Sequence, residues 1–307
     1  MLARTAPYFA PPSECLACPY PQPCVALPPP HQKGHRINAS VIYDCVFRGL
    51  LPTGRLQQEL QLLEEQVRSA AATLFGPSAG VDISGGINNV RGRWLEYILG
   101  LVFWNAASQH PGTAIVRLPD ASTMQFHELY EPKSQEYLQQ LIDSLAESGT
   151  ELTMYNPDFV CLTNLPADLN SEFVNSVNMS SSDLVRLLRA YTLIKGKCEP
   201  ENVRFVITVK TSLRSDRSYQ VVHEANIVKA LIAHLAGRLW NKSLRTAFYA
   251  MIVGPVSEGD RKVFTNPATH TLVQVSWSPE VLVDGAFRID SVDDVREIAD
   301  RLLAGVI

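Results

Sequence analysis

Apolar residues along the chain recur with two different periods, which predict helices and strands in alternation. Spacings of three and four positions predict amphipathic helices at residues 54–75, at 131–148 and at the closing stretch 292–303. Residues 88–107 are almost wholly apolar after Glu96, which indicates a helix buried in the core. Further helices are expected around residues 182–194 and from about Ser218 to Trp240.

Short apolar runs lie between these helical stretches and predict strands. They comprise TAIVRLP (113–119), LTMYNPDFVCLT (152–163), NVRFVITVK (202–210), RTAFYAMIVG (245–254) and HTLVQVSW (270–277). The second run carries Asp158 inside it. Strands that alternate with helices are typical of an α/β protein, so we expect a mixed central sheet flanked by helices.

The N-terminal segment follows neither period, because nine prolines lie within residues 1–36. Proline disfavours helix and central strand, so we interpret this segment as an extended arm before a single domain at residues 37–307. Cys15 and Cys18, followed after twelve residues by His31 and His35, have the ligand spacing of a tetrahedral zinc site. Cys24 is an alternative ligand, and three consecutive prolines before His31 exclude an ordinary ββα finger. The competing interpretation is a proline-packed arm with free thiols.

Composition narrows the class of protein. Hydrophobic residues form 46% of the 307, enough for a sizeable core, and charged residues form only 19%, which favours surface buried in an oligomer. The chain has neither 18 consecutive apolar residues nor the pattern of a signal peptide, so we expect a soluble cytoplasmic protein. The formal net charge is −4, but residues 210–245 hold seven Lys/Arg and two Asp/Glu. Such a basic stripe is typical of a DNA-binding surface, or of a solvated helix face.

Three ionisable residues have an arrangement that suits phosphodiester chemistry. Asp158 interrupts an apolar run, Lys210 ends one, and Glu224 follows Lys210 by fourteen positions on the next expected helix. If they converge at one sheet edge, two carboxylates can hold a divalent cation beside an ammonium group, and such a metal activates water. Glu96 is a further candidate acid. Taken singly, each also fits a structural role: a turn aspartate, an edge lysine and a solvent-facing glutamate.

Between Lys210 and Glu224 lie Arg214, Asp216 and Arg217. Arginine recognises the O6 and N7 atoms of guanine in the DNA major groove, and a carboxylate accepts from the amino group of cytosine. The segment therefore combines candidate cleavage and base-reading residues.

Three segments carry a resemblance to a known family. NPDF (156–159), VKTSLRSDRSYQVVHEANIVKAL (209–231) and RGRWLEYILG (91–100) resemble the CCGG-family type II restriction endonucleases, a branch of the PD-(D/E)XK nucleases. The resemblance runs from about residue 80 to the C-terminus and includes LPDAST (118–123) and FYAMIVG (248–254). It implies the restriction-endonuclease fold, and within the family it extends to the PfoI-like enzymes. The N-terminal arm has no counterpart in the resemblance.

By this resemblance, Asp158 and Glu224 bind Mg²⁺, Lys210 positions or helps activate the attacking water, and Glu96 supports the site as an additional acid. Most nucleases of the wider superfamily have an acid two residues before the lysine, where this chain has Thr208. The family moves that carboxylate to the following helix, which is the place of Glu224.

The resemblance also implies the target. Arg214 and Arg217 would contact two guanines and Asp216 the paired cytosines, so a homodimer or homotetramer would read a palindrome of CC and GG half-sites in double-stranded DNA. The core is either contiguous CCGG or interrupted CC-N-GG. Two alternatives remain: a repair or transposition nuclease of the same fold, and a sequence-specific DNA-binding protein that does not cleave.

Overall fold

The computed structural model describes residues 23–27, 35–48, 50–174, 181–272 and 279–306. Three of the proposed zinc ligands, Cys15, Cys18 and His31, lie outside these ranges. The fourth, His35, packs its ring against Phe75 at a centroid distance of 5.0 Å. The described part of the arm contains a small antiparallel sheet of β1 (Val25–Ala26) and β2 (Arg36–Ile37).

A five-stranded sheet forms the centre of the molecule. Its strands are β3 (Ala114–Arg117), β4 (Phe159–Leu162), β5 (Val203–Lys210), β6 (Ala247–Val253) and β7 (Gly285–Ile289), in the spatial order β3-β4-β5-β6-β7. The β3–β4 and β4–β5 pairs are antiparallel, whereas β5, β6 and β7 run parallel. The sheet is therefore mixed, as the sequence predicts, and β5 lies at its centre with partners on both sides.

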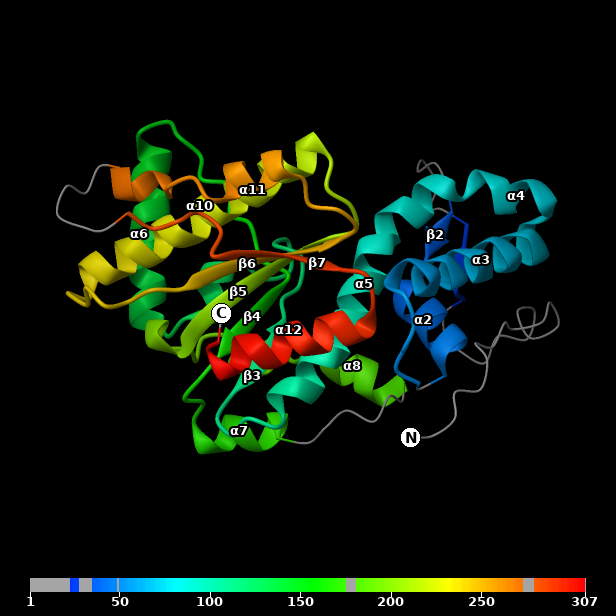
Figure 1. Cartoon of the computed structure of the whole chain (residues 1–307), viewed down its shortest axis with the longest axis horizontal. Coiled ribbons are helices and arrows are strands. Elements are labelled where there is room, and N and C mark those ends of the chain that lie inside the picture. Colours follow the sequence, from blue (N-terminus) through cyan, green and yellow to red (C-terminus); the bar gives the residue numbers. More distant parts are fainter. Residues whose placement is uncertain (1–22, 28–34, 49, 175–180, 273–278, 307) are drawn as a thin grey trace.

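Helices cover both faces of this sheet, which confirms the predicted α/β fold. They are α2 (Ala39–Phe47), α3 (Leu56–Phe75), α4 (Pro77–Asp82), α5 (Ser84–Ala107), α6 (Pro132–Glu147), α7 (Ala167–Phe173), α8 (Ser181–Arg189), α9 (Tyr191–Ile194), α10 (Ser215–Arg238), α11 (Glu258–Phe264) and α12 (Val292–Ala304). Short 3-10 turns occupy Phe126–Leu129 (η1), Pro200–Asn202 (η2) and Thr269–Leu272 (η3). Figure 1 shows α6 and α10 on one face, α5 and α12 on the other, and α2–α4 beside the edge toward which β5, β6 and β7 run.

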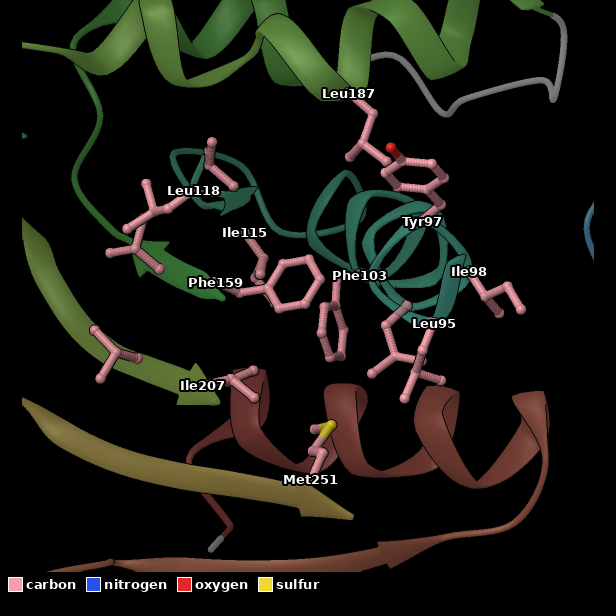
Figure 2. Packing of buried hydrophobic residues seen from close by; sticks show 14 of the residues in the cluster. Leu95, Tyr97, Ile98, Phe103, Ile115, Leu118, Phe159, Leu187, Ile207 and Met251 are labelled. Atoms are coloured by element: carbon pink, nitrogen blue, oxygen red, sulfur yellow. The ribbon is translucent and has the colours of Figure 1, made fainter. Parts of the chain in front are cut away.

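Helix α5 is the central element of the core, because its second half is apolar on every side. Phe103 on α5 meets Phe159 of β4 edge to face, with ring centroids 4.9 Å apart, as Figure 2 shows. Leu187 of α8 approaches the same helix at Gly100, where a side chain would collide with it. Among the described residues, no helix is long and apolar enough to cross a membrane.

Three sequence expectations differ from the structure. Asp158 lies just before β4 rather than inside a strand, since regular pairing begins only after Pro157. Helix α10 begins at Ser215, earlier than expected, and its first turn holds Asp216, whose charge is favoured at a helix N-terminus. The predicted strand at 270–277 is wrong at its start, which belongs to the 3-10 turn η3, and its remainder lies outside the described residues. The fifth strand is instead β7.

Two glycines of α5 allow the packing at the α5–α8 contact to be measured. A Cβ atom at Gly100 would lie 2.9 Å from Leu187 Cδ2 and 3.3 Å from Phe159 Cε1, whereas one at Gly92 meets nothing within 4 Å. Alanine at an open helical position stabilises by about 0.5–1 kcal/mol, and overpacking a core costs roughly 1–3 kcal/mol. In urea titrations we therefore expect Gly92→Ala to raise the free energy of unfolding above the wild-type value. Gly100→Ala should lower it by roughly 1–3 kcal/mol relative to the wild type. Equal effects of the two substitutions would contradict the close approach.

Candidate active site

The central strand β5 presents two polar side chains to one helix. Thr208 and Lys210 are two residues apart and therefore face the same side of the sheet. The Thr208 hydroxyl donates a hydrogen bond to Glu224 Oε2 at 2.7 Å and lies 3.3 Å from Asp158 Oδ2. A single hydroxyl thus stands between the carboxylate before β4 and the carboxylate on α10.

Lys210 and Glu224 form an ion pair inside the protein. Lys210 Nζ lies 3.0 Å from Glu224 Oε1 and 3.3 Å from Oε2, and both residues are buried. Glu224 is drawn inward because its neighbours Val221 and Ala225 are fully buried against the sheet. A buried charge without a partner is costly, so each residue of the pair requires the other or a substitute of the same sign.

Asp158 is fixed from several directions. The backbone N–H of Val209 donates to Asp158 Oδ2 at 2.5 Å, and the N–H of Leu118 donates to the Asp158 carbonyl at 2.9 Å. The side-chain amide of Asn156 donates to the carbonyls of Pro119 and Met124, which holds the turn that precedes Asp158. The Asp158 carboxylate is therefore held against β5 by contacts from the polypeptide backbone.

Glu96 reaches the same region from α5, and Arg117 at the end of β3 holds it. Arg117 Nε donates to Glu96 Oε2 at 2.8 Å, a second guanidinium nitrogen lies 2.5 Å from the same oxygen, and the guanidinium also lies 5.7 Å from the Tyr97 ring centre. Sequence reasoning missed Arg117. The signal that could have revealed it is a charged residue at the end of the apolar strand AIVR. A buried arginine at that place needs an acid nearby, which would have indicated a partner such as Glu96.

The electrostatics of the group follow from its burial and its excess of acids. Burial raises the pKa of Asp158 to about 7, the negative charges of Glu96 and Glu224 add to the rise, and Lys210 opposes it. Burial alone would lower the pKa of Arg117, but the charge of Glu96 and its hydrogen bond, together with Tyr97 and Asp158, outweigh it, and the pKa lies above the ordinary value. Three carboxylates against Lys210 and Arg117 therefore leave one negative charge in the pocket without a cationic partner.

Within the described ranges, no three side chains of His, Cys, Asp or Glu are close enough together to form a metal site. Asp158 and Glu224 nevertheless supply the hard oxygen donors that Mg²⁺ prefers, since both approach the Thr208 hydroxyl. A cation between them would offset both the burial and the repulsion that raise the pKa of Asp158. The donor set therefore fits a divalent metal ion.

A polar cleft of about 470 Å³ adjoins the start of α10. Its lining residues are Gln57, Asn88, Arg91, Thr211, Ser212, Arg214 and Arg217. The Arg217 guanidinium donates to the Thr211 hydroxyl at 2.8 Å, which orients it in the cleft. Asp216 is not part of the lining, and its carboxylate lies 3.5 Å from Arg214 Nε on the exposed side. Two of the three predicted base-reading residues thus share one cleft.

The raised pKa of Asp158 makes a prediction about stability in metal-free buffer. A carboxyl group whose pKa is about 7 in the folded protein and 3.8 ordinarily binds its proton more tightly when folded. Its stabilising contribution is complete below about pH 4 and is lost as the pH rises through about 7. We expect Asp158→Asn to remove this loss. The free energy of unfolding of the variant should therefore rise relative to that of the wild type as the pH increases through that window. Urea titrations at a series of pH values with EDTA measure the difference, and parallel pH profiles would contradict it.

Comparisons with known proteins agree with this arrangement. The profile of the Cfr10I/Bse634I restriction endonuclease family matches residues 33–304. Type II restriction enzyme Cfr10I from Citrobacter freundii is 26% identical over 276 residues, covering 88% of this chain and 95% of that protein. The crystal structure of the type IIF restriction endonuclease Bse634I with cognate DNA superposes with a TM-score of 0.81 at 29% identity, over 91% of this chain and 97% of that one. A second structure of Bse634I restriction endonuclease gives the same values. The chain therefore belongs to the Cfr10I/Bse634I restriction endonuclease family.

Proposed function

We propose that this protein uses Mg²⁺ to cleave double-stranded DNA at a palindrome with CC and GG half-sites, as a member of the CCGG family. As a type II restriction endonuclease it is a site-specific deoxyribonuclease. The observation that carries the finer proposal is the cluster of Asp158, Lys210 and Glu224 around the Thr208 hydroxyl, next to a cleft lined by Arg214 and Arg217.

Restriction endonucleases of this family generally use a divalent metal ion. Asp158 and Glu224 would hold Mg²⁺, because their carboxylates are the hard-oxygen ligands it prefers and because both meet at one hydroxyl. When bound, the ion supplies charge stabilisation at the attacked phosphate and lowers the pKa of water. Thr208 takes the place of an acid on the strand, and its hydroxyl orients the Glu224 carboxylate that fills this role from α10.

Lys210 and Glu96 complete the proposed chemistry. The Lys210 ammonium has three donors, so it can keep its contact with Glu224 while donating to the attacking water or to a phosphate oxygen. The positive charge of that ammonium stabilises the negative charge that grows on the phosphate in the transition state. Glu96, oriented by Arg117, adds a further acid at the rim, partly through water.

We assign the recognition of DNA bases to the start of α10. Arg214 and Arg217 would donate to O6 and N7 of two guanines, and Asp216 would leave its exposed pairing with Arg214 to accept from cytosine amino groups. Symmetry in a homodimer or homotetramer makes the target a palindrome. The distance between the two copies of α10 would decide between a contiguous CCGG core and an interrupted CC-N-GG core. Bse634I has been crystallised with cognate DNA, which supports DNA as the partner here.

For the N-terminal arm we retain structural zinc as a proposal. Its support is the spacing of Cys15, Cys18, His31 and His35 in the sequence. His35 is the one described member of this set, and its ring packs on Phe75, so that a zinc ion there would brace the arm against the end of α3.

Removing either proposed metal ligand should stop cleavage. We expect Asp158→Asn and Glu224→Gln each to lower the rate of DNA cleavage in Mg²⁺ by at least about a thousandfold. The affinity for DNA should change much less, because the lost carboxylate charge holds the metal ion for the chemical step and does not contact the DNA directly. Lys210→Ala should also act on rate more than on affinity. Single-turnover cleavage and competition binding separate the two effects.

The control for the carboxylates is Glu258→Gln, which neutralises an exposed acid of α11, and the control for the lysine is Lys262→Ala on the same helix. Both should cleave as the wild type does. A variant of Asp158 or Glu224 that retains most of its cutting in Mg²⁺ would remove that residue from the ligand set. Equal losses of rate and affinity in Lys210→Ala would make Lys210 a phosphate anchor instead.

Base reading makes a separate prediction. Replacing Arg214 or Arg217 by alanine should cost on the order of 1–3 kcal/mol per half-site with cognate DNA, and the loss should double in a symmetric dimer. Binding to DNA without the site should change much less, because phosphate contacts elsewhere supply it. Arg296→Ala is the matched control, since this exposed arginine on α12 is also paired with a neighbouring aspartate.

Competition binding with site-bearing and site-free duplexes measures this effect. If both duplexes weaken by the same factor, the two arginines contact phosphates, and the proposed CC/GG specificity loses its main support.

A further inference from the structure

A second cleft lies beside the arginine cleft at the start of α10. It has a volume of about 410 Å³ and is lined by Arg55, Gln57, Val253, Gly254, Arg288 and Asp290. Gln57 lines both clefts, so they adjoin at the N-terminus of α3. The second cleft contains none of the residues placed in cleavage or base reading.

The two clefts together concentrate positive charge on a protein whose net charge is −4. Their linings contain five arginines, of which Arg91, Arg214 and Arg288 pair with Glu64, Asp216 and Asp290, so a formal excess of two positive charges remains. In the second cleft, Arg55 is exposed and forms no ion pair with any residue that the structure describes. Arg288 is more than half exposed and pairs with Asp290 at 2.5 Å. An anion that enters this cleft meets one uncompensated guanidinium and one that still has free donors.

The backbone holds the two arginines across from each other. Leu56 N–H donates to the Asp290 carbonyl at 2.8 Å, and Val292 N–H donates to the Gly54 carbonyl at 3.3 Å, so the start of α3 is fastened to the chain between β7 and α12. Gln57 in the first turn of α3 lines the same cleft, and the acid of that turn, Glu59, accepts a hydrogen bond from Gly54 N–H at 2.9 Å. The site is therefore built on fixed elements.

We propose that the cleft of Arg55 and Arg288 binds the phosphate backbone of DNA outside the sequence that Arg214 and Arg217 read. The inference rests on the proposed function, because it continues the same DNA along the adjoining cleft. A symmetric contact with a second copy of the chain fits this cleft poorly, since a two-fold axis would bring like arginine-rich surfaces together. Phosphates fit both the charge and the fork geometry of arginine.

The inference predicts a dependence on DNA length and on salt. With EDTA present to prevent cutting, the double variant Arg55→Ala/Arg288→Ala should bind several-fold more weakly to a duplex that extends a helical turn beyond the site on each side. It should bind like the wild type to a duplex that ends at the site. For each phosphate that the variant no longer neutralises, the ratio of wild-type to variant affinity should shrink about 3.5-fold as salt rises from about 50 to 200 mM. Site-free long duplexes should be bound more weakly by the same factor.

Two further variants sharpen the test. Asp290→Asn removes the acid that partly neutralises Arg288, so it should bind the long duplex more tightly than the wild type does. Arg301→Ala is the control, because this half-exposed arginine is also near an acid, Glu297, but lies at the far end of α12. It should leave binding unchanged.

Other results overturn the inference. Equal binding of the wild type and the double variant to the long duplex would remove DNA from this cleft. An equal reduction in affinity for short and long duplexes would place the arginines in the recognition site itself. A change of oligomeric state in sedimentation, with unchanged affinity per assembly, would make the cleft a subunit contact. The proposed function is tested by the wild type alone: if the wild type neither binds nor cuts DNA, the proposed function fails, and the inference about this cleft fails with it.

Discussion

The buried ion pair between Lys210 and Glu224 is the interaction on which the site depends. Either charge alone would be buried without a partner, so the pair favours the register in which the end of β5 faces the middle of α10. That register brings Glu224 to the Thr208 hydroxyl, and the same hydroxyl lies near Asp158. One electrostatic requirement thus assembles residues that are 66 positions apart in the chain, from Asp158 to Glu224.

The position of β5 explains why the arrangement is rigid. It is the central strand, with β4 antiparallel on one side up to Ile207 and β6 parallel on the other up to Lys210, and Val209 N–H beyond the β4 pairing donates to Asp158, so the strand cannot shift without breaking hydrogen bonds on both sides. The parallel strands β5, β6 and β7 end at the same edge, where the N-termini of α3 and α10 also lie near the arginine clefts (Figure 1). Acids are gathered inside this edge and arginines outside it. The acids can bind a divalent cation, and the arginines can bind a negatively charged polymer.

Much of this could be predicted from sequence because the signals were local. The apolar β5 run ending in Lys210, the amphipathic helix carrying Glu224 and the Asn-Pro-Asp turn each have a distinct pattern, and the resemblance to a nuclease family joined them. The second ion pair could not be found in this way. Arg117 and Glu96 are 21 residues apart on β3 and α5, and only the packing of these elements reveals that they meet.

Other features depended on tertiary context. Strand β7 is short and half exposed, and its sequence GAFRI has too few apolar residues in alternation to stand out; pairing with β6 makes it a strand. The start of α10 also lies earlier than apolar periodicity indicates, because its first turn is polar: Ser215, Asp216 and Arg217. The arginine clefts combine residues from α3, α5, β7 and α10, so they cannot be predicted from any single segment of the sequence.

The most informative measurement is to sequence the ends of DNA fragments produced by the purified protein from a plasmid mixture of diverse sequence. We expect that cutting requires Mg²⁺, stops with EDTA, and leaves ends that all derive from palindromes with CC and GG half-sites. The same data would give the flanking bases and the spacing of the half-sites. Cutting at sites without CC/GG, or cutting that persists in EDTA, would contradict the roles proposed for the cluster around Lys210 and for the arginine cleft.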